Sequence, residues 1–268
     1  MLDSVTELPT HSTFPNSTTV LTFDVDWAPD WMIDDVAERL IAANVRATWF
    51  ATHQSAAISR LLDNPAFEVG IHPNFQDGST QGATPDEILT NLRRWFGAAT
   101  VVRTHSLFQS ERLLQLMTDT YGFKIDCSIY LPLARDVKPH RVRYTSGGSE
   151  LIRVPHVFQD NMFMIAGQSW SAEPEWLRSP GLKVLNFHPV HVWLNSHSTK
   201  AYETLKCSRS LPEWSRSDFN HPSRTQPGVG WFLDHCLSHL RGAQSFTISE
   251  IAARWKKTDD TTELRGAS

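Results

Sequence analysis

Hydrophobic positions along the chain form short continuous runs, which alternate with segments where apolar residues recur at every third or fourth position. The run 18–23 is β-branched, aromatic and uncharged, which is typical of a parallel strand covered on both faces. Residues 29–43 place apolar side chains at helical spacing and acids near their start, which predicts an amphipathic helix. The alternation continues and predicts an α/β fold.

The same two patterns predict further elements. Strands are expected at residues 47–52, 67–72, 101–105, 125–128, 184–188 and 245–248. Helices are expected at 56–62, 85–95, 111–120, 230–240 and 250–255, and Thr84 is placed to cap the second of these. Strands that are each followed by a helix indicate a parallel sheet or a (β/α) barrel.

The chain of 268 residues is long enough for one large domain with a sizeable core. We expect that domain to span 18–255, after an N-terminal segment 1–17. Residues 195–227 are rich in Ser, Arg, Pro and Trp without periodicity, which predicts a long surface insertion or lid. Residues 256–268 are polar and are expected to form a disordered tail.

Charge and composition exclude several classes of protein. A formal net charge of -4 gives no field that would attract nucleic acid or an anionic membrane. No window approaches the roughly 18 apolar residues of a membrane-spanning helix, and the polar, acidic start does not resemble a secretory signal. We therefore expect a cytoplasmic protein. Cys127, Cys207 and Cys236 are odd in number and widely spaced, which predicts buried, reduced thiols without a disulfide.

Two acids, Asp24 and Asp26, follow the first strand, at the edge where parallel α/β folds build their sites. Being two apart on an extended chain, they would project to the same side. Their carboxylates would repel each other unless a cation or a proton lies between them, which suggests a metal site or an acid/base pair. The alternative is that one Asp caps the following helix and the other is solvated.

Polar residues end several other predicted strands. His72, Arg103, His105 and His188 each fall at or just after a strand end, and these ends converge on one mouth in a (β/α) barrel. Carboxylate oxygen and imidazole nitrogen suit zinc or a similar divalent ion. Such an ion lowers the pKa of bound water to about 7 and polarises carbonyl groups.

Five short motifs end or follow the predicted strands, in the order Thr22-Phe23-Asp24-Val25-Asp26, Ala47-Thr48-Trp49-Phe50, Glu68-Val69-Gly70-Ile71-His72, Arg103-Thr104-His105-Ser106 and Leu185-Asn186-Phe187-His188-Pro189. In order and spacing, they resemble the motifs of the polysaccharide deacetylase (NodB-homology) family of carbohydrate esterases. The details look closest to a subgroup linked to bacterial surface-polysaccharide (O-antigen or capsule) synthesis. The resemblance implies a distorted barrel of about seven parallel strands, one divalent metal ion, with zinc as the expected ion, and hydrolysis of an N-acetyl group on an amino sugar.

The resemblance also implies roles for individual residues. Asp24 would be the general base and His188 the general acid that protonates the leaving amine. Arg103 would orient Asp24 through a charge-assisted hydrogen bond. The metal ligands would be Asp26, His72 and Asn74, while the residues on the substrate side of the site would be His105, Ser106 through its backbone N–H, and His191.

One departure from the family pattern concerns the metal. The family's second motif has a further histidine four residues after the first, and here that position is Gln76. Asn74 is the nearest substitute, since its amide oxygen could coordinate a hard cation, and His105 is the other candidate. Such a site should bind zinc less tightly than one with Asp and two His.

This departure keeps two other functions open. The chain could be a catalytically inactive relative that binds a glycan or sugar nucleotide. It could also be a hydrolase of another amide on the same scaffold. If it is a deacetylase, the lack of a signal fits a nucleotide-linked or lipid-linked amino-sugar or polysaccharide precursor inside the cell.

Overall fold

A computed structural model describes residue 14 and residues 17–144, 149–208, 210–220 and 223–266. The expected N-terminal segment 1–17 therefore lies outside the described residues, except for Phe14 and Ser17. No helix in the described part of the chain is long and apolar enough to cross a membrane.

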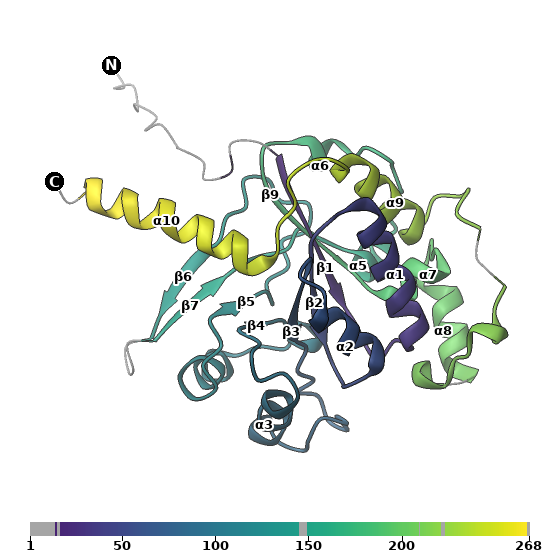
Figure 1. The fold of residues 1–268 in the computed structure, drawn as a ribbon, viewed down its shortest axis with the longest axis horizontal. Helices are drawn as coiled ribbons and strands as arrows, with labels where there is room; N and C mark the ends of the chain where they lie inside the picture. Colours follow the sequence, from purple (N-terminus) through teal and green to yellow (C-terminus); the bar gives the residue numbers. More distant parts are fainter. Residues whose placement is uncertain (1–13, 15–16, 145–148, 209, 221–222, 267–268) are drawn as a thin grey trace.

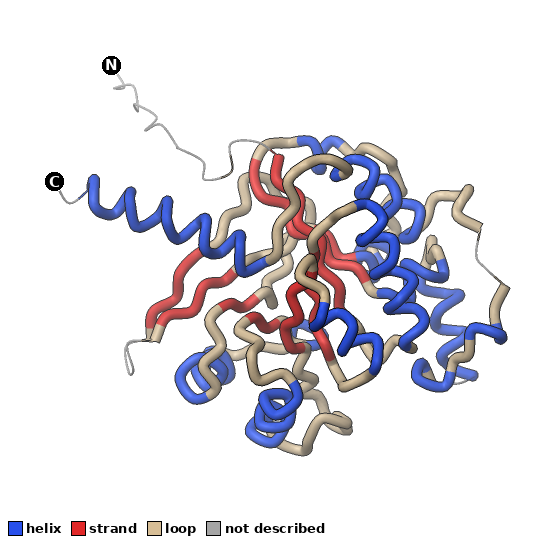
Figure 2. The backbone as a smooth tube through the Cα atoms, viewed as in Figure 1, coloured by secondary structure: helices blue, strands red, loops and turns tan. Residues whose placement is uncertain are grey.

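One curled sheet of nine strands forms the centre of the molecule, in the order β6-β7-β5-β4-β3-β2-β1-β9-β8 (Figures 1 and 2). All neighbouring strands are parallel except β6 and β7, which form an antiparallel pair. This sheet confirms the expected α/β class and forms a half-barrel. The strands are β1 Ser17–Asp24, β2 Ala47–Ala51, β3 Phe67–Ile71, β4 Val101–Val102, β5 Ile125–Asp126, β6 His140–Arg143, β7 Glu150–Arg153, β8 Phe158–Gln159 and β9 Gly181–Phe187.

Helices surround this sheet. On one side α1, α7 and α9 pack against one another, and α10 lies beside β6 and β7 at the far end of the molecule (Figure 1). The helices are α1 Asp30–Ala43, α2 Ala56–Asp63, α3 Pro85–Trp95, α4 Glu111–Gln115, α5 Asp160–Ile165, α6 Glu175–Arg178, α7 Pro189–Leu194, α8 Thr199–Ser208, α9 Val229–Leu240 and α10 Ile248–Gly266.

The first strand lies inside the sheet, between β2 and β9, and its apolar residues anchor the core. Phe23 is fully buried and stacks on Trp49 of β2 at 4.5 Å and on Phe187 of β9 at 5.8 Å between ring centroids. Aromatic pairs at this spacing add stabilisation beyond their buried area. The register that brings these rings together also aligns the polar ends of the three strands.

Several expected elements differ in the structure. The strand expected at 101–105 is only β4, and a 3₁₀ turn at His105–Leu107 follows it. The helix expected at 111–120 is α4 followed by one π-helical turn, Leu116–Thr120. The segment 195–227, for which no periodicity indicated a helix, contains α8.

The C-terminal part also differs. No strand forms at 245–248, and α10 begins at Ile248 and runs to Gly266, through most of the expected disordered tail. Arg141 of β6 forms ion pairs with Asp259 and Asp260 of α10, at 3.3 and 2.7 Å. These contacts fasten the polar helix to a strand that lies far away in the sequence.

All three cysteines are free, as expected. Cys127 and Cys236 are buried, but Cys207 on α8 is exposed, so the expectation of three buried thiols is wrong for that residue.

Candidate metal centre

A buried polar network surrounds the end of β1. The Arg103 side chain is fully buried, and its Nη1 lies 3.0 Å from Asp24 Oδ1. Asn186 of β9 donates from Nδ2 to the other oxygen of Asp24 at 2.7 Å and accepts from Arg103 Nη1 at 2.6 Å. The guanidinium also lies over the Phe50 ring, 4.4 Å from its centroid. Both oxygens of Asp24 are therefore held in fixed positions by side chains from two other strand ends.

The charges around Asp24 determine its ionisation. Burial alone would raise the pKa of this carboxyl, but Arg103, His72 and His188 outweigh burial and hold the pKa below its ordinary value. The carboxylate is therefore ionised at neutral pH.

The chain turns sharply after β1. The strand ends at Asp24, and both Asp26 and Trp27 adopt positive φ angles, 44° and 57°. Both carboxylates still face His72 and His188, as expected of acids that share a side, but a turn brings them there and not an extended chain. Residues other than glycine seldom adopt positive φ angles, and such strain is concentrated at functional sites. Here the turn carries the Asp26 carboxylate over the ends of β3 and β4.

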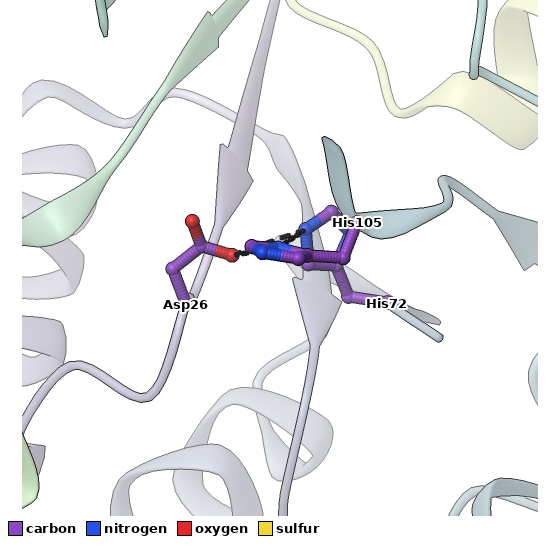
Figure 3. A group of neighbouring side chains, drawn as sticks. All are labelled: Asp26, His72 and His105. Carbon is purple, nitrogen blue, oxygen red and sulfur yellow. Dashed lines mark hydrogen bonds and ion pairs between the residues drawn. The ribbon is translucent and has the colours of Figure 1, made fainter. Parts of the chain in front are cut away.

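Three side chains meet at that point (Figure 3). Asp26 Oδ1 lies 3.1 Å from His72 Nε2 and 3.0 Å from His105 Nδ1. The two imidazole nitrogens are 3.4 Å apart. His72 directly follows β3, while His105 opens the 3₁₀ turn after β4, so the group joins three neighbouring strand ends.

The backbone fixes both imidazoles. His72 Nδ1 donates to the Arg103 carbonyl oxygen at 2.7 Å, so Nε2 is the atom that faces Asp26, where it can carry a proton or bind a metal ion. The His105 backbone N–H donates to the Pro73 carbonyl at 2.9 Å, and the next residue, Ser106, has a φ of 54°. This strained turn directs the His105 ring toward the acid.

The spacing of these atoms fits a divalent ion. A tetrahedral ion with bonds of about 2.0–2.1 Å places its ligand atoms about 3.3 Å apart. One carboxylate oxygen and two imidazole nitrogens at 3.0–3.4 Å match that value and the donor types that zinc prefers.

Electrostatics also favour a cation here. Burial would raise the pKa of Asp26, but hydrogen bonds from His105 and His72 hold the pKa well below its ordinary value. Burial would lower the pKa of His72, yet the charges of Asp24 and Asp26 raise it. The nearby carboxylates thus attract positive charge, which a proton on His72 or a metal ion can supply.

His188 lies on the opposite side of the two acids. Its Nε2 is 3.5 Å from Asp26 Oδ2 and 4.0 Å from Asp24 Oδ2. Asp160 holds this ring, because one of its oxygens accepts from His188 Nδ1 at 2.5 Å and the other accepts from the His188 backbone N–H at 2.7 Å. Burial opposes protonation, but Asp160 outweighs it and raises the pKa of His188 to about 10.

Asn74 and Gln76 occupy the loop after His72. Asn74 lines the same cavity as Asp26 and His105, but its Oδ1 accepts a hydrogen bond from the Gln76 backbone N–H at 3.1 Å. The amide oxygen therefore closes the loop locally. The structure brings His105, with Asp26 and His72, into the group that can hold a metal ion.

Ser106 and His191 flank the centre in different ways. Ser106 is exposed, and its backbone N–H has no hydrogen-bond acceptor among the described residues. His191 is buried behind His188, with ring centroids 5.7 Å apart, and burial lowers its pKa to about 4. Its Nδ1 lies 3.2 Å from Ser196 Oγ, so the ring supports the wall near His188.

A cavity of about 450 Å³ opens beside the cluster. Its wall includes Asp26, Trp27 and His105 as well as Tyr202 and Lys206 of α8. The segment 195–227, expected as an insertion or lid, thus contributes part of the cavity wall.

Asn186 is the functional candidate that the sequence analysis missed. It is a fully buried amide between two apolar residues of the strand, Leu185 and Phe187. A polar residue inside such a run needs a hydrogen-bond partner, which is a signal that sequence reasoning can use.

His156 is fully buried and stacks on Tyr130, and its Nε2 lies 2.9 Å from Gln159 Oε1. Burial and the charge of Arg103 lower its pKa from 6.5 to about 3. Below about pH 6.5 the unfolded chain binds a proton here that the folded chain does not. The free energy of unfolding should therefore fall by about 1 kcal/mol per pH unit from pH 6.5 toward 4 because of this group.

Chemical denaturation of metal-free wild type and of His156→Gln, across this pH range, measures the contribution. The slope should be smaller in His156→Gln, while the exposed control His239→Gln should retain the wild-type slope. Equal slopes in all three proteins would show that His156 is not kept neutral by burial.

A family model described as WbmS-like polysaccharide deacetylase matches residues 21–206 of the chain. The structure is also similar to that of a protein from Bordetella bronchiseptica described as a polysaccharide deacetylase involved in O-antigen biosynthesis. The two chains are 29% identical, the match covers 84% of this chain and 91% of that one, and the TM-score is 0.69.

Two further solved structures match the chain with lower TM-scores. A peptidoglycan N-acetylglucosamine deacetylase, Bc1960, is 16% identical, with coverage of 89% of each chain and a TM-score of 0.47. The peptidoglycan deacetylase PdaC from Bacillus subtilis is 12% identical, with coverage of 94% of this chain and 97% of that one and a TM-score of 0.46. No curated protein sequence matches the chain.

Proposed function

The chain belongs to the WbmS-like polysaccharide deacetylase family, and we propose that it removes the N-acetyl group from an amino sugar with the help of one divalent metal ion. Members of this family are hydrolases of carbon–nitrogen bonds other than peptide bonds. The observation that supports the metal-dependent reaction is the meeting of Asp26, His72 and His105 beside the anchored carboxylate of Asp24.

We assign the third ligand position to His105. Its Nδ1 lies 3.0 Å from Asp26 Oδ1, whereas the amide oxygen of Asn74 is used within its own loop. Imidazole nitrogen is a better zinc ligand than an amide oxygen. In this proposal His105 replaces the histidine that the family pattern places at position 76.

The ion would polarise the amide carbonyl and make a water molecule more acidic. Asp24 is the general base, because its carboxylate is ionised, buried and beside the cluster. Arg103 and Asn186 fix its two oxygens, so the base is preorganised for one proton transfer. The same hydrogen bonds keep the pKa of Asp24 low, so the carboxyl group readily gives up the proton again after the reaction.

His188 is the general acid. Asp160 keeps its ring protonated and holds it with Nε2 toward Asp24 and Asp26. A proton held there can pass to the departing amine as the carbon–nitrogen bond breaks. The free backbone N–H of Ser106, on the His105 side, is available to donate to the carbonyl oxygen as it gains charge.

We propose that the substrate is an amino sugar in a precursor of a bacterial surface polysaccharide, acted on inside the cell. The similar protein from Bordetella bronchiseptica is described as involved in O-antigen biosynthesis. The cavity of about 450 Å³ is within the usual range for small-molecule sites.

The test combines metal analysis with an acetate-release assay. Protein purified without chelator should contain about one equivalent of a divalent ion and release acetate from N-acetylated amino sugars. Chelation should reduce the rate to the uncatalysed level, and addition of zinc or another divalent ion should restore it. Metal binding without any acyl release from acetylated or formylated sugars would instead favour a glycan-binding relative.

A further inference from the structure

Helix α8 presents two polar side chains to the cavity beside the cluster. Tyr202 and Lys206 are four residues apart, so they lie on the same face of the helix, and both line the cavity with Asp26 and His105. The Lys206 Nζ lies 5.6 Å from the centre of the Tyr202 ring. The face of α8 that looks into the cavity therefore carries an ammonium group next to a phenol.

Among the described residues, no carboxylate forms an ion pair with Lys206. The interaction that the structure shows for its ammonium group is the contact with the Tyr202 ring. Asp26 is the one carboxylate among the residues that line the cavity, and it belongs to the candidate metal centre. A divalent ion bound there would more than balance its charge. The wall of the cavity therefore carries a positive charge that no carboxylate of the described residues pairs with.

Tyr202 adds a neutral hydrogen-bond donor beside this charge. Its ring packs against His191 at 4.7 Å between centroids, which fixes it near the general acid. Burial and the charge of Asp26 raise the pKa of the phenol to about 12, so it keeps its proton at neutral pH. An ammonium and a phenol that both donate are suited to a carboxylate or phosphate oxygen.

We propose that the substrate is an acylated amino sugar that also carries an anionic group, a ring carboxylate or a phosphoryl group, and that Lys206 binds this group. The inference rests on the proposed deacetylase function for the acyl group, but the anion contact can be measured by binding alone. Because Lys206 is exposed, water and salt weaken the contact, and its effect should be moderate.

The experiment compares three sugars: N-acetylglucosamine, its 1-phosphate and the corresponding N-acetylated uronic acid. In the wild type, kcat/KM for at least one anionic sugar should exceed that for the neutral sugar by about tenfold at low salt. Lys206→Gln should bring this ratio close to one, and Lys206→Arg should retain most of it. The two anionic sugars distinguish a phosphoryl group from a carboxylate.

Lys200→Gln is the matched control, because it removes the same charge from an exposed position on the same helix. It should leave the ratio unchanged. A wild-type ratio near one, or equal losses in Lys206→Gln and Lys200→Gln, would overturn the proposal.

Calorimetric binding of the same sugars separates this inference from the deacetylase function. If no sugar is hydrolysed, the proposed function fails, but tighter binding of an anionic sugar that Lys206→Gln abolishes still supports the anion contact. Tighter binding that Lys206→Gln leaves unchanged would place the anion elsewhere, for instance on the metal ion, and would overturn the inference.

Discussion

Asp24→Asn is expected to lower kcat for acetate release by about 10³-fold while the protein keeps its metal ion. An amide has nearly the shape of the carboxylate but cannot accept a proton at neutral pH. Asp24 is not one of the three residues whose ligand atoms meet, so the metal content should stay near that of the wild type. The measurements are steady-state kinetics and elemental analysis of the same preparation.

The substitution also removes the charge that faces the buried guanidinium of Arg103, so stability must be measured in parallel. Asp24→Glu is the second variant, because it keeps the negative charge but moves the carboxylate. Asp24→Glu should also release acetate slowly, but it should be more stable than Asp24→Asn. Asp63→Asn, at an exposed position at the end of α2, should be as active as the wild type. A folded, metal-loaded Asp24→Asn with more than about a tenth of wild-type kcat would remove Asp24 from the role of base.

The fold was predictable where neighbours in the sequence decide burial. Helix α3 runs from Pro85 to Trp95 as expected, with the Thr84 side chain accepting from the Glu87 backbone N–H. The strands β1, β2 and β3 also follow from their apolar runs, because both faces of each are covered.

The C-terminal helix α10 was not predicted from the pattern of polar and apolar residues. Residues 245–248 alternate polar and apolar side chains, which suggested a strand, but Thr247 and Glu250 form reciprocal side-chain bonds that start α10. This Ser/Thr-x-x-Glu signature of a capping box was visible in the sequence. The partners of the later turns were not, because Arg141 comes from a hairpin more than a hundred residues earlier.

The candidate site was predictable in its residue types and not in its geometry. Polar residues at strand ends correctly indicated that Asp24, Arg103 and His188 lie together. The position of His105 depends on the backbone instead. Ser106 and Leu107 have φ values of 54° and 55°. Residues other than glycine seldom adopt positive φ angles, and neither serine nor leucine signals such a turn in a sequence. The choice between Asn74 and His105 therefore required coordinates.

That choice leads to the second large effect, which is expected for His105→Ala. Substitution of a residue that only hydrogen-bonds to a metal ligand can weaken metal affinity by roughly 100-fold. Loss of one of the three protein ligands themselves should weaken it by more. At the free metal concentrations of an ordinary preparation the variant should be largely metal-free and should lose activity accordingly. Competition with a chromogenic chelator measures the affinity directly, without any assumption about the substrate.

Two comparisons make this result specific. Asn74→Ala should keep affinity within about tenfold of the wild type, because the Asn74 side chain supports only its own loop. The exposed His239→Ala should have no effect, which controls for the number of histidines. The reverse order, with Asn74→Ala metal-free and His105→Ala fully loaded, would assign the third ligand to the amide. His105 would then serve the substrate side of the cavity, and the short distance between His105 and Asp26 would reflect a hydrogen bond in the metal-free protein.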